Sequence, residues 1–240
     1  MKRLRRRVCL AVLLAVVGAH AFAAAPTDQE IGTARQPEAL VARFSVEIVP
    51  SAAPSQVRRQ DWVFVRSAER IELRKGAIDE TWSRDARGRI AFERTFHEHA
   101  KVVDYSSGEL ATLGVQADWK TLAGFVDARE MAALRLRGRS RSGPEQRLRY
   151  EGRIGDEQVR IDWLPALQLP ALVQRDSRSR GRTRIELKSH QTALPPPDAR
   201  SSGYLHLDAA DFGDMDYEPV VRLSEALDIR SGWRRPHSHD

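Results

Sequence analysis

The chain has 240 residues, with 39 lysine and arginine residues against 33 aspartate and glutamate residues, and a formal net charge of +6. Residues 1–25 hold five of these basic residues and none of the acidic ones, so 34 basic residues face 33 acidic ones in the rest of the chain. This near-neutral balance argues against a nucleic-acid-binding protein, which needs a basic face. Cys9, the single cysteine, also lies in that first segment, so the remaining chain has no disulfide, thiol nucleophile or thiolate metal site.

The N-terminal segment has the pattern of a secretory signal peptide. Its basic residues precede an apolar run from Val8 to about Val17, and small residues ending in AHAFAAA follow. A basic start, an apolar stretch of about 7–15 residues and an A-x-A site are typical of export signals. The run is shorter than the roughly 20 residues of a membrane-spanning helix. We therefore expect a signal peptide at residues 1–25, cleavage near Ala23 or Ala25 and a periplasmic protein, with an uncleaved anchor as the alternative.

Alternating apolar and polar residues then predict strands. VARFSVEIV (41–49) has a period of two, which is typical of a half-buried strand. DWVFVRS, ERIELRKG, IDETWSRD and GRIAFERTFHEHAKVVDY continue this pattern as far as Tyr105, with turn signals at Lys75-Gly76 and at residues 85–88. We expect an antiparallel meander with one face exposed to water.

After Tyr105 the apolar spacing becomes helical. SSGELATLG and DWKTLAGFVDAREMAALRL predict one or two short helices, and strands resume with QRLRYEGRIG, DEQVRIDWLP, LPALVQRDS and GRTRIELKSH. Residues 193–240 are expected to form a linker, one helix from about Glu218 to Ile229, and a polar tail. Because strands and helices do not alternate regularly, the order predicts an α+β protein with a curved antiparallel sheet and one to three helices against its inner, concave face.

Two stretches resemble a known family. ERIELRKGAIDETWSRDARGRIAFERTFHEHAKVVDY and the later IDWLPALQLPALVQRDSRSRGRTRIELKS are similar to the periplasmic lipoprotein-carrier superfamily, which includes the LolA and LolB carriers and the RseB-like stress sensor. The resemblance covers residues 40–190 and implies an unclosed β-barrel, here a half-barrel domain at residues 26–192. It also implies that helices cover a concave apolar side, which receives acyl chains or an apolar partner segment. The arginine that locks the lid in the carriers is not assigned to a position in this sequence.

Aromatic residues are the candidates for lining such an apolar cavity. The set comprises Trp62, Phe64, Trp82, Phe92, Phe96, Trp119, Phe125 and Trp163. The alternative is that these side chains fill an ordinary core, because aromatic residues contribute most to burial. The expected partner is an apolar ligand or lipoprotein segment, with an envelope protein as the alternative, no nucleic acid, no cofactor and at most peripheral contact with a membrane.

Polar candidates are few. His97 and His99 lie two residues apart on an expected strand, where they would share a face and hold a metal if a third ligand lay nearby; solvent-exposed histidines are the alternative. The acidic stretch LDAADFGDMDYE (207–218) does not match a calcium-binding loop and predicts an Asp-rich turn or an acidic docking strip for a basic partner.

Motifs of nucleophilic and nucleotide chemistry are missing from the sequence. It contains no GxSxG, no Walker loop and no GxGxxG. We therefore expect a protein that is not an enzyme. Three hypotheses remain: a carrier or sensor for an apolar ligand, an envelope interaction protein with a filled core, and a metal-binding protein that uses histidine.

Overall fold

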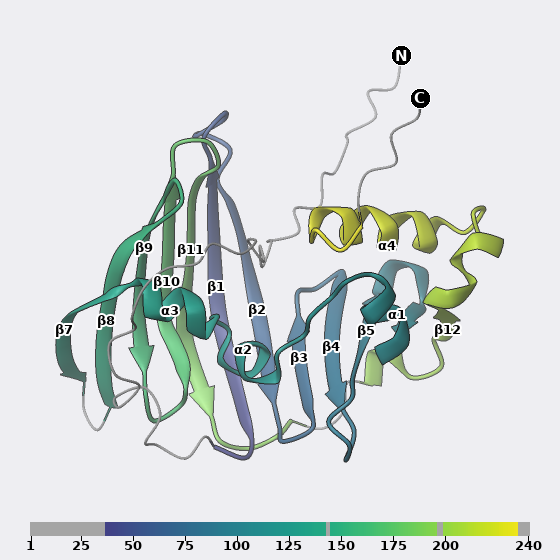
Figure 1. Cartoon of the computed structure of the whole chain (residues 1–240), viewed down its shortest axis with the longest axis horizontal. Coiled ribbons are helices and arrows are strands. Elements are labelled where there is room, and N and C mark those ends of the chain that lie inside the picture. The colour runs from purple at the N-terminus through teal and green to yellow at the C-terminus, as the bar shows by residue number, and fades with distance from the viewer. Residues whose placement is uncertain (1–36, 143–144, 196–198, 235–240) are drawn as a thin grey trace.

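A computed structural model describes residues 37–142, 145–195 and 199–234. Within these residues the chain forms one curved, unclosed sheet of twelve strands, accompanied by four α-helices and three short 3-10 helices (Figure 1). The α+β class and the curved, mostly antiparallel sheet expected from the sequence are confirmed. The expected signal peptide lies outside the described residues.

The sheet has the order β12-β6-β5-β4-β3-β2-β1-β11-β10-β9-β8-β7. Its strands are β1 (Leu40–Pro50), β2 (Arg58–Arg66), β3 (Arg70–Arg74), β4 (Ile78–Arg84), β5 (Ile90–Phe96), β6 (Lys101–Tyr105), β7 (Arg135–Ser142), β8 (Glu145–Ile154), β9 (Glu157–Leu164), β10 (Leu169–Ser177), β11 (Gly181–Gln191) and β12 (Leu205–Asp208). Strands β1 to β6 form one antiparallel meander and β7 to β11 a second. The pairing of β1 with β11 joins the two meanders into one sheet.

The period of two along the strands decides which face is buried. On β1, Phe44, Val46 and Ile48 are buried, while the intervening residues are more exposed. In the antiparallel register Phe44 lies opposite Trp62 of β2, so these two residues face the same side of the sheet. We call this side the inner face, because the helices pack against it.

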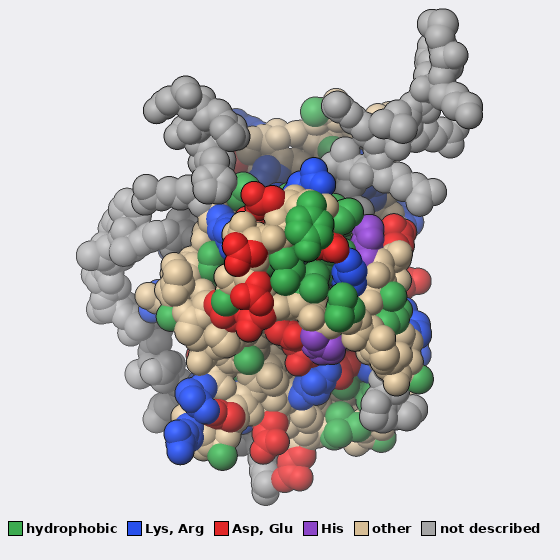
Figure 2. Space-filling model, turned by 90° about the vertical axis from the view of Figure 1, so that its right-hand side faces the viewer, with side chains coloured by type: hydrophobic (Ala, Val, Ile, Leu, Met, Phe, Trp, Pro, Cys, Tyr) green, Lys and Arg blue, Asp and Glu red, His purple; other side chains and the backbone are tan. Residues whose placement is uncertain are grey.

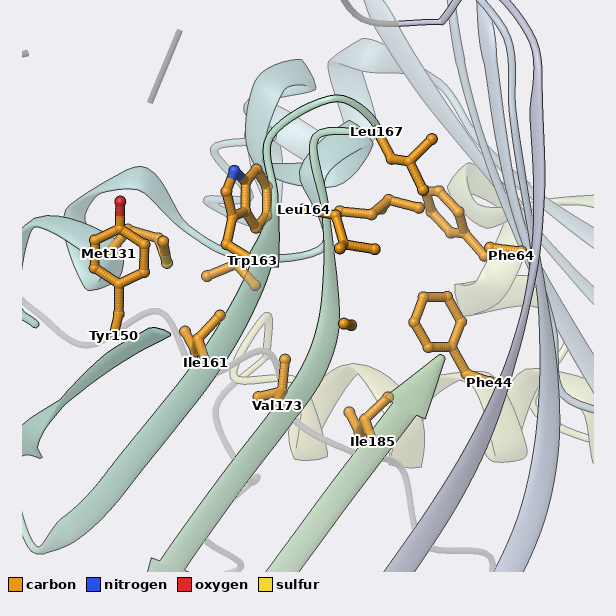
Figure 3. Packing of buried hydrophobic residues seen from close by; sticks show 14 of the residues in the cluster. Phe44, Phe64, Met131, Tyr150, Ile161, Trp163, Leu164, Leu167, Val173 and Ile185 are labelled. Carbon is orange, nitrogen blue, oxygen red and sulfur yellow. The ribbon is translucent and has the colours of Figure 1, made fainter. Parts of the chain in front are cut away.

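Four α-helices follow or interrupt the strands. They are α1 (Ser107–Thr112), α2 (Trp119–Gly124), α3 (Ala128–Ala133) and α4 (Pro219–Arg230). The side chains of Ser106, Asp118 and Asp127 cap the first three at their N-termini, so each of these six-residue helices begins independently of the others. The apolar residues divide into two clusters, one beneath α2 and α3 and one beneath α1 and α4. Figure 3 shows part of the first cluster, with Phe44, Phe64 and Trp163 directed into one interior.

The C-terminal segment adds more to the sheet than the sequence indicated. The expected helix is confirmed as α4. Before it, β12 pairs in parallel with β6, and the 3-10 helix η3 (Ala209–Asp214) follows. No helix in the described part of the chain is long and apolar enough to cross a membrane.

Candidate functional site

The candidate cavity residues belong to both clusters. Trp62, Phe64 and Trp163 are buried in the first cluster, and Trp119 and Phe125 pack against it from α2 and its C-terminal end. Phe92 and Phe96 are buried in the second cluster, and Trp82 contacts both. The structure therefore brings five of the eight residues together beneath α2, and places the other three beneath or beside α4.

Phe125 fills the space between α2 and the sheet. Its ring stacks on Phe44 with a centroid distance of 5.3 Å, and it meets the rings of Trp62 and Phe64 edge to face at 6.1 and 5.6 Å. Such distances are typical of favourable aromatic contacts. The aromatic residues here thus pack against one another, as in a filled core.

The backbone of Phe125 is strained. This residue is the C-cap of α2 and has φ +65° and ψ +1°, in the left-handed region. Glycine or asparagine usually occupies this position at a helix end, because a side chain with a Cβ there costs about 1–2 kcal/mol. A large aromatic residue is therefore held in an unfavourable backbone conformation by the packing of its ring.

Arg66 fastens α2 to the sheet. It is 1% exposed, and its guanidinium donates to the carbonyl oxygens of Ala123 at 2.6 Å, Leu167 at 2.7 Å and Gln168 at 3.3 Å. These acceptors belong to α2 and to the loop between β9 and β10. Burial lowers the pKa of Arg66 to about 10, because the interior disfavours the charged form. The guanidinium thus links one strand to two segments that cover the inner face.

The second cluster contains a comparable buried arginine. Arg94 of β5 donates to Asp228 of α4 at 2.9 Å and to the Ser224 hydroxyl at 2.9 Å. Tyr105 completes the network with bonds to both of these residues. Burial alone would lower the pKa of Arg94, but the nearby carboxylates of Asp228 and Glu80 outweigh it and raise this pKa. Burial raises the pKa of Tyr105 as well, so this phenol stays protonated. Arg94 therefore holds α4 against the sheet as a charged group.

Sequence reasoning missed both arginines, although their positions carry a signal. In DWVFVR, Arg66 follows Trp62 and Phe64 at intervals of two, and in FERTF, Arg94 lies between Phe92 and Phe96. Both arginines occupy the apolar phase of an alternating strand, where a charged residue has to find buried partners.

A cavity of about 520 Å³ lies on the opposite, outer face of the sheet. Its walls include Val65, Glu72, Thr81 and Glu93, which alternate along β2 to β5 with the residues of the inner face. Charged pairs cross its floor; for example, Glu72 accepts hydrogen bonds from both Arg70 and Arg74, which hold its pKa low despite burial. This cavity is polar and charged, unlike the expected apolar hollow.

His97 and His99 are not on a strand, contrary to the expectation from the sequence. They form a 3-10 helix, η1 (His97–His99), because the chain turns sharply at Ala100, which has φ +50°. The His97 ring contacts Asp79 at 2.8 Å and Tyr204 at 3.3 Å on the outer face, while His99 is exposed. Among the described residues no group of three or more His, Cys, Asp or Glu side chains is arranged to hold a metal ion. The metal hypothesis therefore has no third ligand in that part of the chain.

Comparisons with known proteins find similar folds at low identity. No protein-family model matches the chain, and no curated protein matches its sequence. Among solved structures, PNGF-II is similar with a TM-score of 0.42 and 8% identity over 75% of this chain and 33% of its own. MucB has a TM-score of 0.35 and 13% identity over 68% of this chain and 56% of its own, and it has also been solved with MucA from Pseudomonas aeruginosa. A LolA-superfamily protein from Nitrosomonas europaea has a TM-score of 0.24 and 8% identity, covering 68% of this chain and 90% of its own.

MucB and a LolA-superfamily protein are thus among the solved structures to which this chain is weakly similar. The chain spans about a third of the length of PNGF-II and just over half of that of MucB. The likenesses concern the fold and assign no activity, ligand or partner to this chain.

Proposed function

We propose that this chain is a non-enzymatic binding protein of the cell envelope, exported to the periplasm by residues 1–25. Its half-barrel domain, residues 26–192, would hold an apolar ligand such as a lipid or a lipoprotein acyl chain. The ligand would occupy the space beneath α2 that the Phe125 ring fills in the closed form.

The strained conformation of Phe125 is the observation that carries this proposal. Withdrawing the ring together with its backbone would relieve this strain, which lowers the cost of moving it. When the ring leaves, the faces of Phe44, Trp62 and Phe64 are uncovered together. Ligand pockets are typically lined by aromatic and aliphatic side chains of this kind.

The attachment of α2 also supports a movable cover. A helix of six residues is too short to be stable on its own, so its position depends on tertiary contacts. Those contacts include the hydrogen bond from Arg66 to Ala123 and the packing of Gly124 beside the Trp163 ring. Breaking a small number of such contacts would release α2 without disturbing the strand ladders beneath it.

A second candidate function is an envelope interaction protein with a permanently filled interior. The complete burial of Phe64, Phe92 and Phe96, each at most 2% exposed, favours this alternative. In that case the surface of the sheet and its ends would bind a partner protein, and α2 would stay closed.

Binding of a fluorescent apolar probe separates the two functions. The sample is the chain expressed at full length and purified after any processing by the producing cell. We would titrate it with N-phenyl-1-naphthylamine and displace the probe with palmitate. Native mass spectrometry of the purified protein would detect retained lipid. We expect saturable binding of one probe molecule per chain and its displacement by palmitate.

Two variants locate that binding. Phe125→Trp enlarges the ring that occupies the site, and is expected to weaken probe affinity about tenfold, since displacing the ring becomes harder. Tyr217→Trp makes the same kind of change at an aromatic residue that is 73% exposed, and should leave affinity unchanged. Absence of saturable binding, or equal effects of the two variants, would refute the carrier function and leave the interaction protein.

A further inference from the structure

The two ends of the sheet carry opposite charges. β7 is one free edge, and four arginines lie along it, all exposed: Arg135, Arg137, Arg139 and Arg141. β12 is the other free edge, and the stretch that begins at its last residue, 208–218, holds five acidic residues and no basic one. The near-neutral chain therefore has a basic edge and an acidic end, separated by the whole width of the sheet.

Many charged side chains between these ends form ion pairs, some of them with a neighbour on the same strand. Arg160 contacts Asp162 at 2.8 Å, and Arg184 contacts Glu186 at 3.1 Å, as typical members of an extensive set of ion pairs. At the ends this pairing is incomplete. Within the described residues, three side chains of β7 make no ion pair, and we call them the basic edge: Arg135, Arg137 and Arg141. Three residues beside β12 are likewise without an ion pair in the described part of the chain, and we call them the acidic end: Asp211, Asp214 and Asp216.

The acidic end also exposes apolar side chains. Leu205 of β12 is 59% exposed and Tyr217 is 73% exposed. Figure 2 views this end of the molecule and shows Asp and Glu side chains gathered beside hydrophobic ones. Exposed apolar side chains beside unpaired charges are typical of surfaces that bind another protein.

The basic edge and the acidic end lie at opposite ends of an unclosed sheet, so they do not meet within one molecule. We propose that they meet between molecules: the β7 edge of one copy docks on the β12 and η3 end of the next copy. Both partners are edge strands with free backbone groups, so strand pairing can add to the attraction of opposite charges. Because two different surfaces join, the contact is head-to-tail and repeats along an open row of molecules.

Arginines on an edge strand also protect it from pairing with a similar edge, and this explanation needs no partner. Edge protection and docking differ in the sign of charge that they require on β7. Protection needs only charge, so glutamates would serve as well as arginines. Docking needs charge opposite to that of the acidic end.

Sedimentation velocity tests the proposal. The sample is the chain expressed at full length and purified after any processing by the producing cell. We expect the weight-average mass to rise with protein concentration at about 25 mM salt, and the association constant to fall at least tenfold at about 300 mM salt, where screening is stronger. A chain that stays monomeric at about 200 μM and low salt would overturn the proposal.

A charge-swap experiment makes the test specific. The first variant reverses the basic edge: R135E, R137E and R141E. The second reverses the acidic end: D211K, D214K and D216K. Each variant alone should be monomeric, because its two ends now have the same sign, and an equal mixture should associate at least as strongly as the wild type. This recovery also shows that both variants are folded.

A third variant is the matched control. It makes the same change of net charge as the first variant, at three exposed arginines away from both ends: R43E, R87E and R178E. We expect it to associate like the wild type. Association of either end variant alone, a monomeric mixture, or loss of association in the control would each overturn the proposal.

Discussion

Replacing Phe125 by glycine or by alanine separates the strain of its backbone from the packing of its ring. Complete removal of a core phenylalanine side chain costs about 3–5 kcal/mol, and Phe125 is only partly buried, so we expect Phe125→Ala to lower the free energy of unfolding by about 2–3 kcal/mol. Alanine keeps a Cβ at φ +65°, whereas glycine does not. Phe125→Gly should therefore be about 1 kcal/mol more stable than Phe125→Ala, the reverse of the usual order at a helical position.

The same two variants should bind an apolar probe more tightly. In the wild type the probe has to displace the ring, and removing a competing interaction of about 2 kcal/mol corresponds to roughly a 30-fold gain in affinity. Urea unfolding followed by far-ultraviolet circular dichroism measures the stabilities, and titration with N-phenyl-1-naphthylamine measures the affinities. Equal stability of the two variants would refute the role of backbone strain. Unchanged affinity in both would refute the placement of the ligand beneath α2.

Three further predictions concern the buried and paired charges. Arg66→Lys keeps the charge but cannot reach all three carbonyl oxygens, so amide hydrogen exchange in α2 should speed up at least tenfold while the strands keep their protection. Asp228→Ala leaves Arg94 buried without its carboxylate and should cost about 3–5 kcal/mol in urea unfolding, whereas changing both residues to leucine should cost less than the single change. Burial opposes ionisation of Asp162, but its two arginine partners outweigh this and lower its pKa. Asp162 therefore stabilises the fold above pH 3.8, and this effect is lost as the pH falls further. In Asp162→Asn, the decline of melting temperature in acid should be smaller than in the wild type.

Local patterns predicted the central strands well. VARFSVEIV has strict alternation, and the structure gives it a strand with its apolar residues buried. The boundary between the expected strands QRLRYEGRIG and DEQVRIDWLP also coincides with the turn between β8 and β9, where Gly155 has φ +58°, a conformation that favours glycine. These features depend on neighbouring residues, which a sequence displays directly.

The two edge strands could not be predicted in the same way. RLRGRSRS of β7 alternates arginine with one leucine, one glycine and two serines, so no continuous apolar phase marks a strand. Residues 205–208 form a strand because β6 offers them a parallel edge about a hundred positions earlier in the chain. Pairing over such a distance leaves no local trace.

The candidate site was predicted in its residue types but not in its arrangement. Trp62, Phe64 and Phe125 were expected in one apolar interior and do lie together, whereas Phe92 and Phe96 pack in a separate cluster. The division arises from the path of the sheet and the docking of α4, and both depend on long-range contacts. Whether the aromatic residues enclose a ligand remains a prediction.

Quenching of tryptophan fluorescence by palmitate brominated at mid-chain tests the central claim most directly, because bromine quenches only the indoles that it contacts. If the ligand binds beneath α2, quenching will saturate and will largely disappear when Trp62 and Trp163 are both changed to phenylalanine. The Trp233→Phe variant, whose indole packs against Phe92 at 5.2 Å beside α4, will then be quenched like the wild type. Quenching that persists without Trp62 and Trp163, or that disappears with Trp233, would contradict the account.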